Sequence, residues 1–498
     1  MSETSNQNII DKSNDNIASG TMFIAFAKVF WLFAGYAITF TLPRLISVDT
    51  YGVYGVVSGA MNVLNMVVIM GTLQGVSKFV SADEKNAKAI HFLSLKVLLL
   101  LGGSLTLVYF LLSTFGIIGD FLNDPSLTPY LQMTALITFF YSFYSVNVGY
   151  LNGKREFKKQ AFLDMFFVSF KAICMLSFAW FGINYLKTNG LLETIGGFAF
   201  AAFVVLILSF FVIKFKFEKT TSPYTLSEVS KFVISIMSFT FILNLLMNTD
   251  LFLVKKLTLE NTDQQVGYYT GALTISRIPY SLMMTVSLII FPLISKVTSI
   301  GDKERTKRYI ENALKYPFIL LLGCAVVISS NSDLIIKIIL GQKYISPAPT
   351  GEVLSVLVFA VTGLAIFTLS TSIISGSGKP AVSLGIGVIA LLIDIAINWA
   401  FIPKYGLLGG AYSKGVSLTI AVLICLVYLY KKHNSSLPIL TFIRGIGVAA
   451  LTVYLADLYI PVGIVDGFIK LALVGIVFFI FIFLTQEFKV KEILALRK

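Results

Sequence analysis

The chain has 498 residues, of which 56% are hydrophobic and only 13% are charged, and its formal net charge is +13. The charged share is about half of that in an ordinary soluble domain, which excludes a water-soluble globular protein. Apolar stretches of the roughly 20 residues that a membrane helix needs recur from Ser19 almost to the C-terminus. We therefore expect an all-α polytopic membrane protein.

The chain opens on a polar segment, 1–18, which is rich in Asn and Ser and has neither the basic region nor the cleavage site of a signal peptide. We expect a disordered cytoplasmic tail there. The apolar runs that follow predict about fourteen transmembrane helices. Their approximate bounds are 19–42, 51–72, 92–114, 129–150, 160–182, 194–214, 232–254, 266–292, 316–336, 353–375, 381–402, 408–430, 440–459 and 464–485. The pairs of helices around Pro380 and Gly406 are the easiest to miscount.

The distribution of Lys and Arg predicts the orientation, because cytoplasmic connections retain positive charge. If the N-terminus is cytoplasmic, the inner segments hold 25 of the 39 Lys and Arg residues and the outer segments hold seven. Both termini are therefore expected in the cytoplasm. The basic net charge is then mainly a signal of topology, and we expect no nucleic-acid partner.

Three short segments of the first half of the chain have similar counterparts in the second half, in the same order. The separations between the counterparts are 215, 225 and 216 residues. The paired segments are 52–54 with 267–269, 153–154 with 378–379, and 190–192 with 406–408. This pattern predicts a repeat of six helices. Because six is even, both halves cross the membrane with the same orientation and are related by an axis along the membrane normal.

The repeat predicts the domain organisation. An N-lobe of helices 1 to 6 covers 19–214, a cytoplasmic linker covers 215–231, and a C-lobe of helices 7 to 12 covers 232–430. Helices 13 and 14, within 440–485, have no counterpart in either half, and a cytoplasmic tail follows over 486–498. These two helices could pack on one lobe, guide a lipid tail or stabilise the fold.

Several motifs resemble those of a known family. They are Thr50–Tyr54, Asp250–Tyr269, Phe291–Pro292 and Ile402–Ala411. These stretches resemble the Wzx-type polysaccharide-biosynthesis flippases, which share a superfamily with MATE multidrug exporters and lipid II flippases. The resemblance implies a MATE-like fold of two six-helix lobes. It covers essentially the whole chain, but the motifs are loop and packing signatures.

The resemblance implies a function as well. A flippase of this kind moves a polyprenyl-diphosphate-linked oligosaccharide from the cytoplasmic to the outer leaflet by alternating access, for cell-surface polysaccharide synthesis. Its partners would be this lipid-linked oligosaccharide, membrane lipids and glycan-assembly proteins, and its location a bacterial or archaeal cytoplasmic (inner) membrane. A lipid II flippase and a cation-coupled multidrug exporter of the MATE type remain the alternatives. No cofactor is expected, and H⁺ or Na⁺ would be the coupling ion.

A headgroup that crosses the membrane needs a polar path, so the helices that line it should each have a polar stripe. Asn62 and Asn65 lie on such a stripe of helix 2, and Asn244 and Asn248 on one of helix 7. We expect these four side chains to bind substrate. The alternative is that polar side chains hold helices together through hydrogen bonds.

Cations within the spans are a sharper signal, because an unpaired charge in the membrane interior is costly. Lys28 and Arg277 fall on the stripes of repeat-related helices, and Lys171 lies inside helix 5. We expect all three to bind substrate, and Lys28 and Arg277 to hold the diphosphate, since Arg can grip phosphate oxygens with two hydrogen bonds.

Three acids inside the spans, Asp164, Asp250 and Asp394, are candidates for ion coupling. Each has a structural alternative. Asp394 could form an ion pair with Lys414, and Asp250 could be a residue at the outer end of helix 7. Asp164 lies seven residues before Lys171, too far for a direct pair, and could instead sit at the membrane interface.

We do not expect an enzyme. Gly376–Lys379 echoes a phosphate-binding loop, but Ile373 replaces its first Gly and Pro380 its final Ser or Thr. The outer connections are short, and the three cysteines all fall in apolar segments, which disfavours a metal site.

Overall fold

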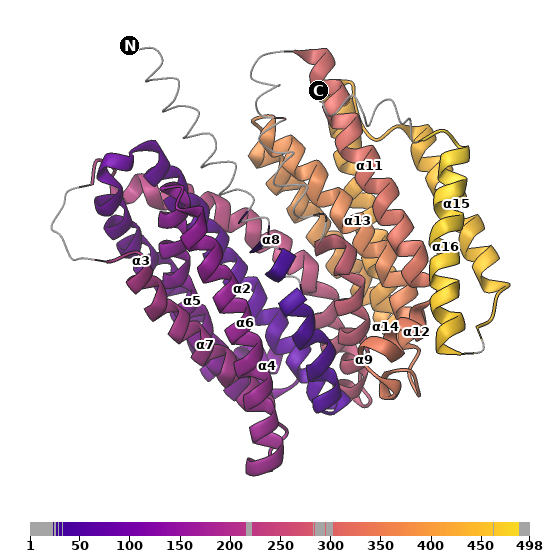
Figure 1. Ribbon diagram of the computed structural model, residues 1–498, viewed down its shortest axis with the longest axis horizontal. Coiled ribbons are helices and arrows are strands. Elements are labelled where there is room, and N and C mark those ends of the chain that lie inside the picture. The colour runs from indigo at the N-terminus through magenta and orange to yellow at the C-terminus, as the bar shows by residue number, and fades with distance from the viewer. Residues whose placement is uncertain are drawn as a thin grey trace. The chain divides into compact units, whose positions relative to one another are not determined.

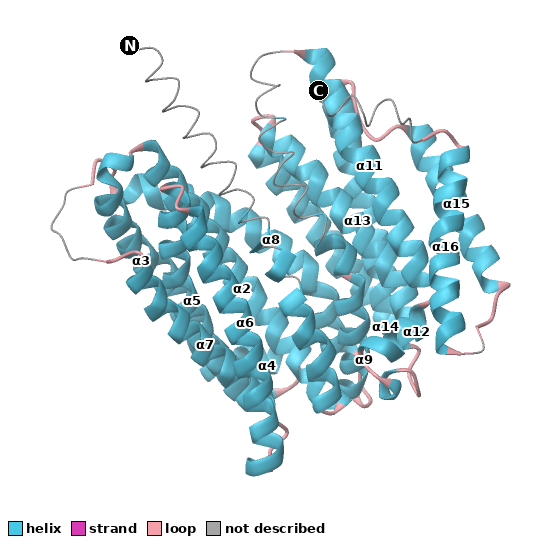
Figure 2. Ribbon diagram, in the orientation of Figure 1, coloured by secondary structure: helices cyan, strands magenta, loops and turns pink. Residues whose placement is uncertain are grey.

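The computed structural model describes residues 23, 26–27, 29–31, 33–215, 222–281, 283, 294, 302–461 and 463–487. The described residues form helices joined by turns and loops, and Figure 2 shows no strand among them. The chain divides into two compact units, Met1–Asn244 and Leu245–Lys498. The division falls inside one long helix, whereas the sequence placed a linker at 215–231.

The first unit is a bundle of long helices that pack side by side (Figure 1). Helix α2 packs against α3 and α5, and α7 packs against α5 and α6. The elements are α2 (Val48–Ala82), α3 (Ala87–Thr114), α4 (Ile117–Phe121), α5 (Thr128–Gly153), α6 (Phe157–Phe181), α7 (Leu191–Val212) and the first part of α8 (Leu226–Leu257). Residues 33–45, which precede α2, are helical as well.

Small residues allow α2 and α5 to approach closely. A Cβ atom at Gly149 of α5 would lie 2.9 Å from the Val76 side chain and 3.0 Å from the Leu73 carbonyl oxygen of α2. One turn later, a Cβ at Gly153 would lie 2.6 Å from the Val80 side chain. Two glycines four residues apart form the kind of small-residue stripe on which membrane helices pack backbone to backbone.

The second unit contains the remaining helices, and α13 is its centre, in contact with α9, α11, α12 and α14. The elements are the last part of α8, α9 (Thr262–Ser276), α11 (Lys303–Ser329), α12 (Ser332–Ile339), α13 (Thr350–Gly376), α14 (Pro380–His433), α15 (Ile439–Asp457) and α16 (Ile464–Leu484).

Helix α14 is a hairpin of two membrane spans. Its backbone breaks at Gly406, where φ is 56° and ψ is −132°, a left-handed conformation that favours glycine. Arms 380–405 and 407–433 then run side by side, since Asp394 on the first contacts Ser417 on the second. The sequence prediction of two helices divided near Gly406 is therefore confirmed, as is the division at Pro380, which begins α14 after α13 has ended at Gly376.

The last two helices, predicted as an appendage, pack on α11 within the second unit (Figure 1). A Cβ at Gly445 of α15 would lie 2.9 Å from Phe318, and one at Gly323 of α11 would lie 2.8 Å from Phe478. The contacts with α11 therefore depend on residues without a side chain. Of the three roles that the sequence allowed, packing on one lobe is the one observed.

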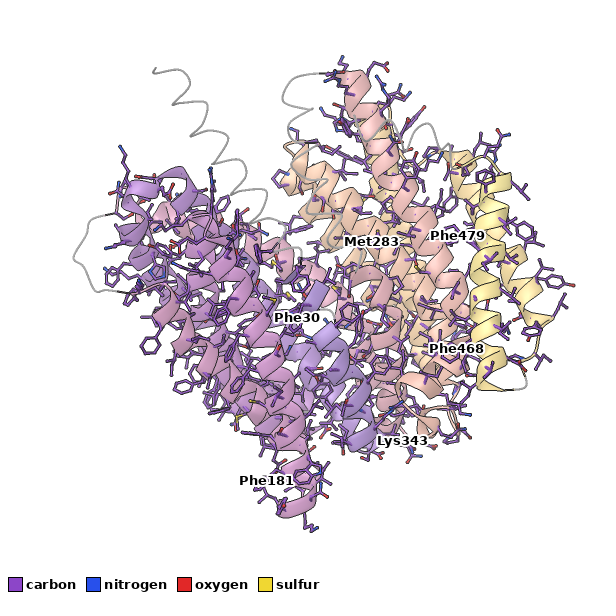
Figure 3. All side chains as sticks on the ribbon, viewed as in Figure 1. Phe30, Phe181, Met283, Lys343, Phe468 and Phe479 are labelled. Carbon is purple, nitrogen blue, oxygen red and sulfur yellow. The ribbon has the colours of Figure 1, made fainter. Side chains whose placement is uncertain are left out.

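The described residues include ten helices long and apolar enough to cross a membrane, with α14 counted once. Large apolar side chains also cover the outside of both units, as in Figure 3 for Phe181 of α6 and for Phe468 and Phe479 of α16, which are between 43% and 53% exposed. Several helices extend beyond their predicted spans: α2 covers Val48–Ala82 rather than 51–72. Helical hydrogen bonding continues after the apolar sequence ends, because backbone groups form these bonds whether the side chains are apolar or polar.

Candidate functional site

The second unit holds a cluster of buried charges centred on Lys414. Its ammonium nitrogen, Nζ, lies 3.0 Å from Oδ1 of Asp250 and 3.6 Å from Oδ2 of Asp394, and it donates to the Leu246 carbonyl oxygen. Lys414 is 1% exposed and both carboxylates are fully buried. Removing one partner of such a buried group typically costs about 3–5 kcal/mol, because it leaves the other charge without compensation.

The second oxygen of each carboxylate accepts a hydrogen bond from a hydroxyl group. Tyr269 donates to Oδ2 of Asp250 at 2.7 Å, and Ser417 donates to Oδ1 of Asp394 at 2.6 Å. Each carboxylate therefore has one oxygen held by a hydroxyl and the other turned toward Lys414. The four side chains come from α8, α9 and both arms of α14, so this cluster joins all four segments.

Local sequence explains how the cluster fits. Gly410 of α14 leaves room for the Tyr269 ring, since a Cβ there would lie 3.2 Å from its hydroxyl oxygen. Asn398, one turn after Asp394, donates its Nδ2 to the Asp394 carbonyl oxygen at 2.8 Å. Within the described part of the chain, Oδ1 of Asn398 has no hydrogen-bond partner although the residue is fully buried. The site therefore holds a spare buried acceptor.

Arg277 follows α9 directly and reaches back to α8. Its Nη2 donates to the Met247 carbonyl oxygen and to Oδ1 of Asn248, the latter at 3.3 Å. Asn248 is 2% exposed, whereas Arg277 is half-buried. A guanidinium has five N–H donors, and the bonds to α8 use one of its three nitrogens. Arg277 is therefore a cation held in a fixed position with part of its surface open.

Four of the predicted site residues thus lie together in the second unit: Asp250, Asp394, Arg277 and Asn248. The ion pair that the sequence allowed between Asp394 and Lys414 is formed. The interpretation of Asp250 as a helix-end residue is wrong. Its side chain is fully buried, and it lies about two turns before α8 ends at Leu257. The role of these residues in substrate binding or ion coupling stays a prediction.

Sequence reasoning missed three contacts of the cluster. These are the shorter ion pair of Lys414 with Asp250 and the hydroxyl donors Tyr269 and Ser417. The available signal was the number of intramembrane charges. Lys414 was the cation within a predicted span that lay nearest in sequence to Asp394, and Asp250 was left without an assigned partner. A buried carboxylate without a partner requires a cation.

The first unit has a second polar cluster, on α5 and α6. Tyr144 donates to Oδ1 of Asp164 at 3.2 Å, and the Tyr141 and Tyr144 rings stack with centroids 5.5 Å apart. Lys171 instead lies over aromatic faces, with Nζ 5.0 Å from the centre of the Phe198 ring. Asp164 and Lys171 therefore have different partners, in agreement with their spacing on the helix.

The predicted polar stripes have mixed environments. Asn62 is exposed, whereas Asn65 is 4% exposed and its Oδ1 has no hydrogen-bond partner within the described ranges. Asn244 donates to the Thr240 carbonyl oxygen of its own helix at 2.8 Å. Lys28 lies outside the described residues. In the part of the chain that the structure describes, no group of three His, Cys, Asp or Glu residues could hold a metal ion.

Solved structures show the class to which this bundle belongs. The chain is similar to the lipid II flippase MurJ in an inward closed conformation, with a TM-score of 0.71 and 16% identity over 93% of this chain and 98% of that one. An inward-facing multidrug resistance MATE transporter gives a TM-score of 0.67 and 13% identity over 82% of this chain and 94% of that one. A transporter from Pyrococcus furiosus gives 0.61 and 13%, over 84% and 95%. The fold is therefore that of the MATE-like transporters of the MOP superfamily.

The family follows from the sequence. A family model described as "Polysaccharide biosynthesis protein" matches residues 41–349, more than half of the chain. The chain belongs to this polysaccharide biosynthesis family. The predicted fold class and family are confirmed.

One curated relative supports the membrane location. An uncharacterized membrane protein, MJ1068, from Methanocaldococcus jannaschii is 27% identical over 154 residues. The match spans 29% of this chain and about 30% of the length of that relative. The chain is thus a multi-pass membrane protein of the polysaccharide-biosynthesis group.

Proposed function

We propose that the protein is a flippase that translocates a polyprenyl-diphosphate-linked oligosaccharide from the cytoplasmic to the outer leaflet of a bacterial or archaeal cytoplasmic membrane. The product would serve cell-surface polysaccharide synthesis. Membership of the polysaccharide biosynthesis family supports the substrate class. The observation on which the proposal mainly rests is Arg277, a half-buried cation fixed within apolar helices.

Arg277 has the properties that a site for a diphosphate needs. Its guanidinium is held through Nη2 by Met247 and Asn248, so little conformational entropy is lost when a ligand binds. The planar group can give a phosphate two parallel hydrogen bonds.

Lys171 of the first unit supports the same class of substrate. It is half-buried in α6, and Nζ faces the Phe198 and Phe167 rings at 5.0 Å and 5.9 Å from their centres. An aromatic face stabilises a cation less than a negatively charged partner does. Lys171 is therefore a second intramembrane cation available to a negatively charged ligand.

The fold supports alternating access as the mechanism, because transporters built from two similar halves expose a site to each side in turn. The buried cluster of Asp250, Asp394 and Lys414 is the candidate for coupling this motion to an ion gradient. A change in its charge would alter the stability of the contacts among α8, α9 and α14 that it joins.

Complementation tests the proposal. The gene is expressed in a bacterial strain that lacks its own glycan flippase, and surface polysaccharide is measured for wild type, Arg277→Ala, Arg277→Lys and Arg305→Ala. Arg305, on α11, is 71% exposed and serves as the matched control. We expect wild type and Arg305→Ala to restore polysaccharide, and Arg277→Ala to reduce it at least tenfold. Full rescue by Arg277→Ala at equal expression would contradict the assigned site.

The two alternative cargoes are tested in parallel. Likeness to a lipid II flippase and to multidrug transporters shows the fold alone, since the identities are 16% and 13%. The same plasmid is therefore introduced into a strain that lacks its lipid II flippase and into a strain that lacks its drug exporters. Drug efflux without restored polysaccharide would show that the protein is a drug exporter. Growth of the strain that lacks its lipid II flippase, without restored polysaccharide or drug efflux, would show that it is a lipid II flippase.

A further inference from the structure

The surroundings of the Lys414 ammonium group consist of oxygen atoms. They are Oδ1 of Asp250 at 3.0 Å, Oδ2 of Asp394 at 3.6 Å and the carbonyl oxygen of Leu246. Carboxylate and carbonyl oxygens are also the ligands that hard metal cations prefer. An ammonium group has the same charge as a monovalent metal ion. The cluster therefore has the composition of a cation site, and a side chain of the protein supplies the cation.

The remaining contacts hold both carboxylates in this arrangement. Tyr269 and Ser417 fix the outer oxygens of Asp250 and Asp394, so the inner oxygens point to a common centre. The charges are also balanced: the two carboxylates are offset by Lys414 and by Arg277, whose guanidinium binds α8 at Met247. An added metal ion would give a buried site one excess positive charge, which is unfavourable where water is excluded.

The elements packed against the cluster bring few other ionisable groups. Helix α8 contributes Asp250, α9 contributes Tyr269 and is followed by Arg277, and the arms of α14 contribute Asp394 and Lys414. Helix α13, which packs against α9 and α14, has Glu352 in its first turn and no other ionisable side chain. Among the residues that the structure describes, these groups can change the charge of the cluster, and so can an ion that enters.

We propose that the ammonium group of Lys414 is a built-in monovalent cation that occupies the place two buried carboxylates would otherwise offer to Na⁺. The cluster then changes charge by exchange of a proton, which leaves the ammonium group or joins a carboxylate, and Na⁺ is not a coupling ion. The assignment of a coupling role rests on the proposed transport function. The occupancy of the cation position does not depend on which lipid is transported.

Thermal unfolding of the purified full-length protein in detergent tests the occupancy. The midpoint temperature, Tm, is measured as NaCl replaces choline chloride at constant ionic strength, for wild type, Lys414→Ala and Lys414→Arg. A ligand that binds only the folded state raises Tm with its concentration. We expect no difference between the salts for wild type and Lys414→Arg. For Lys414→Ala we expect a saturable rise of about 2 °C or more in NaCl.

Two controls define the site. Lys432→Ala removes an exposed lysine of the same helix and should respond as wild type does. The double variant Lys414→Ala with Asp394→Asn removes one carboxylate and should lose the response to Na⁺.

Three results would overturn the proposal. The first is stabilisation of wild type by Na⁺ over choline, and the second is a folded Lys414→Ala protein that does not respond to Na⁺. The third result applies even if Lys414→Ala does not fold. It is a requirement for Na⁺ in transport by the wild-type protein, measured in proteoliposomes. A protein that passes the binding tests but fails complementation would disprove the proposed cargo and leave the cation assignment intact.

Discussion

Tyr269 of α9 donates its phenol hydroxyl to Asp250 of α8 at 2.7 Å, and both side chains are fully buried. This hydrogen bond connects the short α9 to the charge cluster. It also orients the carboxylate, because the other oxygen of Asp250 then faces Lys414. The position of the Tyr269 ring therefore determines the geometry of the ion pair, although Tyr269 has no charge itself.

The first prediction tests this dependence through Gly410. A Cβ added there would lie 3.2 Å from the Tyr269 hydroxyl oxygen and 2.9 Å from the Val254 side chain, so the ring must move. We expect Gly410→Ala to lower the free energy of unfolding by about 1–3 kcal/mol and to reduce transport. The measurements are thermal unfolding in detergent and complementation.

Gly385→Ala is the matched control on the same helix, since no atom lies within 4 Å of the added Cβ. There the extra methyl group should leave stability unchanged or raise it by up to about 1 kcal/mol, because alanine has the higher helix propensity. Equal stability of the two variants would show that the close contact of Gly410 with Tyr269 does not exist in the folded protein.

The second prediction concerns the packing of the last two helices on α11. A Cβ at Gly445 of α15 would lie 2.9 Å from the Phe318 ring and 3.3 Å from Leu322, whereas one at Gly447 would have no atom within 4 Å. We expect Gly445→Ala to destabilise the protein by about 1–3 kcal/mol and Gly447→Ala to have no such effect. Thermal unfolding is again the measurement, and the reverse order of the two variants would contradict the observed docking.

The fold was largely predictable because the membrane simplifies the problem. Apolar length gives the position of each helix, and the left-handed backbone at Gly406 agrees with the predicted division between spans 381–402 and 408–430. Helix ends were less predictable: α11 begins at Lys303 and not near 316, because its first turns are charged and helical. An apolar window locates the lipid, while hydrogen bonding defines the helix.

The candidate site was predictable only residue by residue. Each intramembrane charge could be identified from its cost, but the pairing of Asp250 with Lys414 joins residues 164 positions apart in the sequence. Only packing of α8 against α14 brings them together. Lys171 shows the same limit, since its partners are the aromatic faces of Phe167 and Phe198, which a search for opposite charges does not find.

The third prediction tests the orientation that the distribution of Lys and Arg favours. Leu259, in the connection between α8 and α9, is 91% exposed, and Lys432 at the end of α14 is exposed as well. If both termini are cytoplasmic, the first position faces outward and the second faces the cytoplasm. A membrane-impermeant maleimide should label Leu259→Cys in intact cells, and should label Lys432→Cys only after permeabilisation.

The native cysteines do not interfere with this test, because Cys174 and Cys425 are buried and Cys324 is partly buried inside α11. Wild-type protein provides the background. Labelling of Lys432→Cys in intact cells, with Leu259→Cys protected, would reverse the topology.

The fourth prediction is a pH dependence at Glu487, which follows α16 outside the membrane-spanning segments. Its side chain is 4% exposed and accepts hydrogen bonds from Thr441 at 2.7 Å and from Lys315 and Arg444, both at 3.1 Å. Burial acts to raise the pKa of Glu487, but these hydrogen bonds outweigh it and hold the pKa below its ordinary value. The carboxylate therefore links α11 to α15 and stabilises the folded protein when it is charged.

Because the pKa is lower in the folded state, this stabilisation is complete above the unfolded pKa of about 4.3 and is lost as the pH falls through the folded pKa. We expect Glu487→Gln to lower the free energy of unfolding at pH 7 by about 1–3 kcal/mol. The difference from wild type should stay constant down to about pH 5 and shrink below it. Thermal unfolding of both proteins over this pH range is the measurement, with the exposed Glu260→Gln as control. A difference that persists unchanged at the lowest pH would mean that the charge of Glu487 does not contribute, and that packing of its side chain alone joins the helices.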